Sequence, residues 1–155
     1  MTGPGTGRMI KFPMKIILPL LLALFFPAVI HADWGTDYKG ALALAKAQNK
    51  LVLLDFTGSD WCGYCKLLDK EVLSQPSFKD FADKNYVAVT LDYPHGTPQS
   101  DTVKQQNDAL AKQYNIEGFP TLIVLDADGK ELGREVGYQP GSGPDAVITK
   151  LKSFK

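Results

Sequence analysis

Two kinds of apolar pattern alternate along most of this chain. Residues 51–56 form a short apolar run that includes a single aspartate, which is typical of a strand buried on both faces of a sheet. Residues 38–48 instead carry apolar side chains at helical spacing. Along the whole chain, the pattern predicts helices over 38–48, 62–73, 76–84, 102–115 and 145–154, and strands over 51–56, 86–91, 121–125 and 131–136.

The order of these elements predicts an α/β fold. Strands connected through helices pair in parallel, whereas the turn at Asp128-Gly129 returns the last strand as an antiparallel hairpin. The length of 155 residues and the 45% hydrophobic content fit one ordinary domain. We therefore expect a central mixed sheet with helices on both of its faces.

The first 32 residues differ in composition from the rest of the chain. Basic residues precede an uncharged apolar stretch over 16–30, and Ala32 follows closely. This pattern predicts a secretory signal peptide over 1–32, cleaved after Ala32, and an exported domain over 33–155 that is periplasmic or secreted. A permanent anchor is the alternative, although the stretch is shorter than the roughly 20 residues of a spanning helix and two prolines interrupt it.

Charge and cysteine content narrow the possible functions. The 17 basic and 17 acidic residues cancel, so no global field attracts nucleic acid, and we expect neither a nucleic-acid partner nor an oligomer. Both cysteines lie in one short motif, which leaves no separate disulfide framework. The domain must therefore be stabilised by its hydrophobic core.

The two cysteines, Cys62 and Cys65, lie at the predicted start of a helix. The helix dipole and the free backbone N–H groups there favour a thiolate on the first cysteine, and the second is close enough to form a disulfide with it. Cys62 is then the attacking sulfur, and Cys65 resolves the mixed disulfide. Gly63 reduces steric obstruction around the pair, and Trp61 offers a flat apolar surface to a partner chain.

Three other uses of a Cys-x-x-Cys pair compete with redox chemistry. A structural disulfide closing so small a loop would constrain little chain entropy. A zinc site needs four ligands, and His95 alone cannot complete the set. Copper(I) needs only two thiolates, so a copper carrier stays open as an alternative. The placement after a strand and a loop favours a redox pair without metal or cofactor.

Three segments together resemble the thioredoxin family. These are Asp55-Phe56 at a strand end, the motif Trp61-Cys62-Gly63-Tyr64-Cys65-Lys66, and residues 116–121, which read Ile-Glu-Gly-Phe-Pro-Thr. The resemblance spans nearly all of residues 37–154 and is closest to exported thioredoxin-like proteins. It implies the thioredoxin-like fold and a thiol–disulfide oxidoreductase activity.

The resemblance also implies a substrate site opposite the sulfurs. In this family the bond corresponding to Phe119–Pro120 is cis and faces the two cysteines. A proline has no N–H, so the chain can approach the disulfide there while its neighbours pair with a bound peptide. Gly137, after the last strand, would line the same groove, although a plain strand-end glycine is the alternative.

Asp55 matches the family's buried carboxylate, which takes the proton of the resolving cysteine. The match is imperfect in two respects. The segment from Asp55 to Cys62 is one residue longer than in the thioredoxins proper, and Ala88 stands where they carry a partner lysine.

The remaining residues around the motif do not determine the direction of electron flow. Tyr64 lies in the dipeptide that tunes the pair, and Gly-Tyr is neither the reducing nor the oxidising type. Asp60 opposes a thiolate on Cys62 and Lys66 favours one. His95 is interpreted as a solvated loop residue, with a proton carrier as the alternative.

The function expected from the sequence is thiol–disulfide exchange with cysteine-containing protein substrates outside the cytoplasm. Such an enzyme needs a membrane or soluble redox partner, because that compartment lacks soluble nicotinamide reductants. The alternative is a thioredoxin-fold binding module or copper(I) carrier without turnover.

Overall fold

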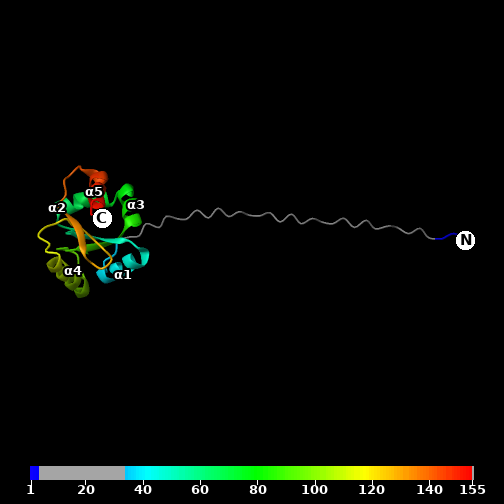
Figure 1. Cartoon of the computed structure of the whole chain (residues 1–155), viewed down its shortest axis with the longest axis horizontal. Helices are drawn as coiled ribbons and strands as arrows, with labels where there is room; N and C mark the ends of the chain where they lie inside the picture. The colour runs from blue at the N-terminus through cyan, green and yellow to red at the C-terminus, as the bar shows by residue number, and fades with distance from the viewer. Residues whose placement is uncertain (4–33, 155) are drawn as a thin grey trace.

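A computed structural model describes residues 1–3 and 34–154, and Figure 1 shows how its elements are arranged. The predicted signal peptide and its cleavage position therefore fall outside the described residues, apart from 1–3. No helix in the described part of the chain is long and apolar enough to cross a membrane. The elements are α1 (Tyr38–Gln48), β1 (Leu51–Thr57), α2 (Gly63–Leu68), the π-helix η1 (Asp69–Leu73), α3 (Pro76–Asn85), β2 (Tyr86–Asp92), α4 (Asp101–Gln113), β3 (Thr121–Leu125), β4 (Glu131–Val136) and α5 (Gly143–Lys152).

The four strands form one mixed sheet in the order β2-β1-β3-β4. β1 and β2 are parallel, as expected for strands connected through helices, and both other pairs are antiparallel. The β3–β4 hairpin turns at Gly129, whose φ of 85° is readily adopted only by glycine. Outside the named strands, Gly35 forms a parallel bridge with Val89. The predicted mixed sheet is confirmed.

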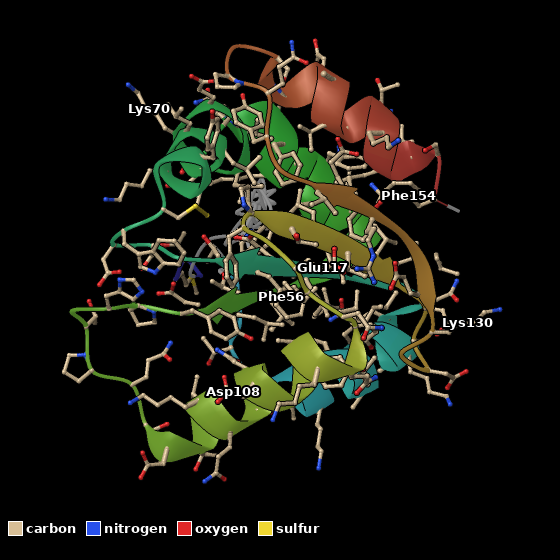
Figure 2. The ribbon with its side chains drawn as sticks, turned by 90° about the vertical axis from the view of Figure 1, so that its left-hand side faces the viewer. Phe56, Lys70, Asp108, Glu117, Lys130 and Phe154 are labelled. Carbon is tan, nitrogen blue, oxygen red and sulfur yellow. A yellow bond between two sulfur atoms is a disulfide. The ribbon has the colours of Figure 1, made fainter. Side chains whose placement is uncertain are left out.

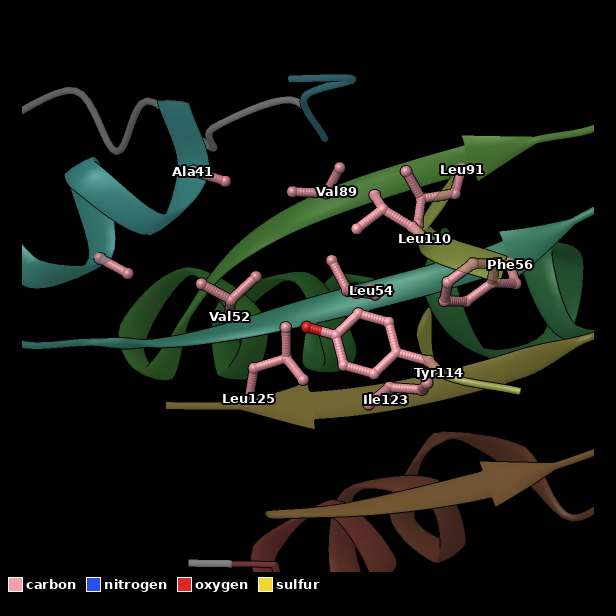
Figure 3. Packing of buried hydrophobic residues seen from close by; sticks show 11 residues of the cluster. Ala41, Val52, Leu54, Phe56, Val89, Leu91, Leu110, Tyr114, Ile123 and Leu125 are labelled. Atoms are coloured by element: carbon pink, nitrogen blue, oxygen red, sulfur yellow. The ribbon is translucent and has the colours of Figure 1, made fainter. Parts of the chain in front are cut away.

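The sheet lies between two helical layers, each with its own hydrophobic core (Figures 1 and 2). α1 and α4 cover one face, and the side chains packed there are seen in Figure 3. α2, η1, α3 and α5 cover the other. Along β1, Val52, Leu54 and Phe56 belong to the first core and Leu53 to the second, all of them fully buried. This explains why the apolar run is nearly continuous.

The helix that carries the cysteines is less regular than its sequence predicts. A single helix is expected over 62–73, but the π-helix η1 follows α2 directly, and the Ser74 N–H donates to the Asp69 carbonyl 2.8 Å away. Within η1, the Glu71 carboxylate accepts hydrogen bonds from the Tyr138 hydroxyl at 2.6 Å and the Gly141 N–H at 2.7 Å. The π-helix thus holds the loop that follows β4.

Candidate active site

The two cysteines lie at the junction of the strand β1 and the helix α2. A loop over residues 58–61 leaves β1, and Cys62 is the N-cap of α2. The two residues form a disulfide, visible as the yellow bond in Figure 2, with their Cα atoms 5.3 Å apart. The Cys65 N–H donates to the Cys62 Sγ at 3.2 Å. Both residues are buried in this disulfide form, with Cys62 7% and Cys65 3% exposed.

Trp61 precedes Cys62, and three contacts with other segments orient its indole ring. Its indole N–H donates to the Tyr93 carbonyl at 2.7 Å. Its face stacks on His95 with ring centroids 4.7 Å apart, and Phe119 approaches it edge-on at 5.8 Å. A Cβ at Gly58 would overlap the indole, so that position requires glycine. The ring is nevertheless 41% exposed and offers an apolar surface beside the sulfurs.

Asp60 connects the cysteine loop to the loop after β2. Its carboxylate accepts hydrogen bonds from the backbone N–H groups of His95 at 3.0 Å and Gly96 at 2.7 Å. These bonds hold the pKa of Asp60 below its ordinary value, with the His95 amide as the largest cause. The Lys66 ammonium donates to the Asp60 carbonyl at 2.8 Å. The two charges flanking the cysteines are therefore engaged with the backbone.

The segment around the predicted substrate-binding proline packs against the same region. The Phe119–Pro120 peptide bond is cis. The Gly137 N–H donates to the Pro120 carbonyl at 2.8 Å, which joins the ends of β3 and β4. Gly137 has a φ of 80°, and space is open where a Cβ would lie. Phe119 also contacts Tyr93 with ring centroids 5.2 Å apart, so the proline loop and the loop after β2 meet beside Trp61.

Asp55 is buried in β1, and it lines the same cavity as Cys65. The cavity has a volume of about 400 Å³. The carboxyl is 5% exposed, and its Oδ1 has no hydrogen-bond partner among the described residues. Burial raises the pKa of Asp55 to about 7, and the negative charges of Asp69 and Asp92 add to the effect. The carboxyl group and the second cysteine therefore line one shared cavity.

Two lysines, Lys66 and Lys79, line the cavity, although neither is at the position that the resemblance suggested. In the register of β1 and β2, Ala88 pairs with Leu53, and Thr90 pairs with Asp55. Lys66 comes from α2 and Lys79 from α3. The lysines that line the cavity therefore belong to helices and not to the sheet.

Sequence reasoning did not find two features of this site. His95 lies exposed in a loop, as expected, but its ring also stacks on Trp61. Asp69, within the predicted helix over 62–73, also lines the cavity that Asp55 and Cys65 share. Its spacing of four residues from Cys65 was the available signal, because such residues lie on one helix face. The two residues between the cysteines are open to solvent. Tyr64 is 57% exposed, and no atom lies within 4 Å of a Cβ built at Gly63.

Comparison with known proteins identifies the family. The model of the thioredoxin-like domain matches residues 38–152. The chain belongs to the thioredoxin-like family. Its fold class is confirmed, and it is a dithiol–disulfide oxidoreductase of the Dsb type.

Individual relatives agree with this assignment. The chain is 38% identical over 126 residues to the disulfide bond reductase DsbH of Chlamydia pneumoniae, covering 81% of this chain and 74% of that protein. It is 33% identical to the thioredoxin-related protein DsbJ of the same organism, covering 83% of this chain but 40% of that one. A solved structure of a DsbH oxidoreductase superimposes with a TM-score of 0.74 at 33% identity, covering 96% of this chain and 94% of the other. A thioredoxin from Thermus thermophilus gives a TM-score of 0.59 at 26% identity, covering 80% and 87%.

Proposed function

We propose that this enzyme reduces disulfides of protein substrates outside the cytoplasm, with Cys62 as the attacking sulfur. The observation that carries the proposal is the unequal placement of the two sulfurs. Cys62 caps the N-terminus of a helix and does not line the cavity, whereas Cys65 lines that cavity together with the Asp55 carboxyl group. The similarity to a chlamydial disulfide bond reductase supports reduction as the direction.

The exchange proceeds in two steps. In the reduced enzyme, the Cys62 thiolate attacks one sulfur of the substrate disulfide, forms a mixed disulfide, and expels the other substrate sulfur as a thiolate. The Cys65 thiolate then attacks the Cys62 Sγ, which forms the disulfide seen in the structure and expels the second substrate thiolate. The enzyme dithiol is oxidised, and the substrate gains two electrons and two protons. The Cys65 N–H and the helix N-terminus favour the Cys62 thiolate.

Asp55 takes the proton of Cys65 in the second step. Its pKa of about 7 suits a group that must accept and release a proton near neutral pH. The shared cavity gives water room to carry that proton between the two side chains. Trp61, Phe119, Pro120 and Gly137 hold the substrate chain alongside the sulfurs.

The dithiol is restored by a membrane or soluble redox protein. Residues 1–32 direct export of the domain and are removed by cleavage after Ala32. Export is tested by expressing the full chain in a Gram-negative host and determining the N-terminus of the periplasmic product by mass spectrometry. A chain beginning at Asp33 is expected. An intact N-terminus, retained in the cytoplasm or the membrane, contradicts it.

Turnover of insulin disulfides with a chemical reductant as electron source tests the reaction. The wild type should reduce many equivalents, Cys62→Ser none, and Cys65→Ala should accumulate a mixed disulfide with insulin, detectable by mass. The reduction potential should lie near the roughly −270 mV of a reductant rather than the roughly −120 mV of an oxidant. One-to-one binding of insulin or copper(I) without turnover would refute catalysis and favour a binding module.

A further inference from the structure

The loop over residues 93–96 determines how the indole of Trp61 is presented. Three contacts of the Trp61 ring come from other segments, and two of them, with the Tyr93 carbonyl and the His95 ring, belong to this loop. Trp61 immediately precedes Cys62, so its orientation shapes the surface next to the attacking sulfur. A change in the conformation of the loop therefore alters the surface next to Cys62.

Asp60 holds this loop in place from the opposite side. The loop follows β2 and has no regular secondary structure of its own. The Asp60 carboxylate accepts from two successive backbone amides, those of His95 and Gly96, across 35 and 36 positions of sequence. Both sides of the Trp61–His95 stack are thus connected through one carboxylate that is adjacent to Trp61 in the chain.

The ring of Trp61 contacts those of His95 and Phe119, and together they form an aromatic surface, the Trp61 wall, beside Cys62. His95 and Trp61 are exposed, and together with Tyr93, Pro94 and Phe119 they line a cavity of about 400 Å³. A small disulfide needs only the Cys62 sulfur for reaction. A polypeptide disulfide carries flanking residues that reach this wall, and ring surfaces bind such residues well at low entropy cost.

We propose that His95 is a specificity-determining residue and Asp60 a positioning residue, which together make the Trp61 wall select polypeptide disulfides over small ones. This rests on the proposed function, since it specifies which disulfides the site prefers. Asp60 acts through the backbone amides it binds rather than through its charge on Cys62.

Steady-state reduction of insulin and of 2-hydroxyethyl disulfide separates these roles. His95→Ala and Asp60→Ala should raise KM for insulin about fivefold, the effect of losing one aromatic contact, with kcat within about twofold. The loss of kcat/KM should be several times smaller for 2-hydroxyethyl disulfide. His95→Phe keeps an aromatic ring against Trp61 and should therefore keep KM for insulin close to the wild-type value. Asp60→Asn keeps one acceptor oxygen without the charge and should stay closer to wild type than Asp60→Ala.

The matched control is Asp128→Ala, which removes an exposed aspartate paired with Lys46 on the β3–β4 hairpin turn. It should leave both substrates unaffected. An unchanged insulin KM in His95→Ala would overturn the proposal. An equal loss for both substrates in Asp60→Ala, repeated in Asp60→Asn, would also overturn it by showing that the charge acts on the thiolate.

Fluorescence tests the positioning role independently of turnover. The chain has two tryptophans, so a Trp34→Phe background isolates the emission of Trp61. Asp60→Ala should shift this emission to the red, because an indole released from the loop meets more water, and an unshifted spectrum contradicts positioning. If the wild type turned over 2-hydroxyethyl disulfide but not insulin, the proposed protein substrate and the selectivity would both fail, while the emission would still decide the role of Asp60.

Discussion

Replacing Asp55 by asparagine removes a buried carboxyl group while keeping the shape of the side chain. The carboxyl has a pKa raised from 3.8 to about 7, chiefly by burial. Because the pKa is higher in the folded protein, the Asp55 carboxyl group loses its proton at a lower pH in the unfolded chain than in the folded one. The wild type therefore loses stability as the pH rises from about 4 to about 7, and the loss persists above that pH. Asparagine does not titrate, so the variant escapes this loss.

The size of the effect follows from the shift. A difference of about three pKa units, at 1.36 kcal/mol per unit, corresponds to about 4 kcal/mol at pH 8. The amide also leaves its polar atom at the Oδ1 position without a partner, which costs about 1–3 kcal/mol at every pH. The informative quantity is therefore the slope. The unfolding free energy of Asp55→Asn minus that of the wild type should rise by about 1.4 kcal/mol per pH unit between pH 5 and 6.

Urea unfolding of the disulfide form at pH 5, 6, 7 and 8 measures this difference, since other titrating groups largely cancel between the two proteins. Asp128→Asn is the control, because its side chain is 80% exposed and its difference from the wild type should be flat over this range. A flat difference for Asp55→Asn as well would refute a raised pKa and, with it, the case for Asp55 as the proton acceptor.

Three further substitutions test other parts of the structure. Asp69→Asn removes a negative charge that raises the pKa of Asp55. When Asp55→Asn is added to this variant, the resulting gain in unfolding free energy should therefore stop rising with pH at a lower pH than it does in the wild-type background. A gain that levels off at the same pH in both backgrounds contradicts the coupling. The Glu71 carboxylate accepts hydrogen bonds from the loop after β4, and these bonds lower its pKa. Glu71→Gln weakens the bonds, so it should destabilise the protein at pH 7 and progressively less as the pH falls through the lowered pKa. An equal loss of stability at pH 3 and pH 7 counts against this role of the carboxylate charge. Leu54→Ala, at a fully buried position, should cost about 2–5 kcal/mol in urea unfolding, and a loss below about 1 kcal/mol would show that the core collapses around the gap.

Local patterns were sufficient for the sheet and for the position of the cysteines. The run over 51–56 indicated a strand buried on both faces, and β1 does contribute to both cores. The helix start at Cys62 followed from the spacing of apolar residues after it. Both features depend on neighbours in sequence, which is the information that periodicity contains.

The missed features depend on contacts between distant segments. The π-helix η1 shifts the helix face by one residue where Glu71 meets Tyr138, 67 positions away, and the apolar spacing does not resolve such a shift. The stacking of His95 on Trp61 depends on the bonds from Asp60 to a loop 35 positions further on. The pKa of Asp55 depends on burial and on Asp69, both set by the packing of α2 and η1 against β1.

The hydrogen bond from the Cys65 N–H to the Cys62 sulfur makes one backbone amide a reporter of the redox state. A thiolate accepts this bond more strongly than a disulfide sulfur does, because the acceptor then carries charge. The first turn of α2 should therefore tighten whenever the pair is reduced and loosen when it is oxidised. Hydrogen exchange at that single amide would follow electron transfer without any label on the sulfurs.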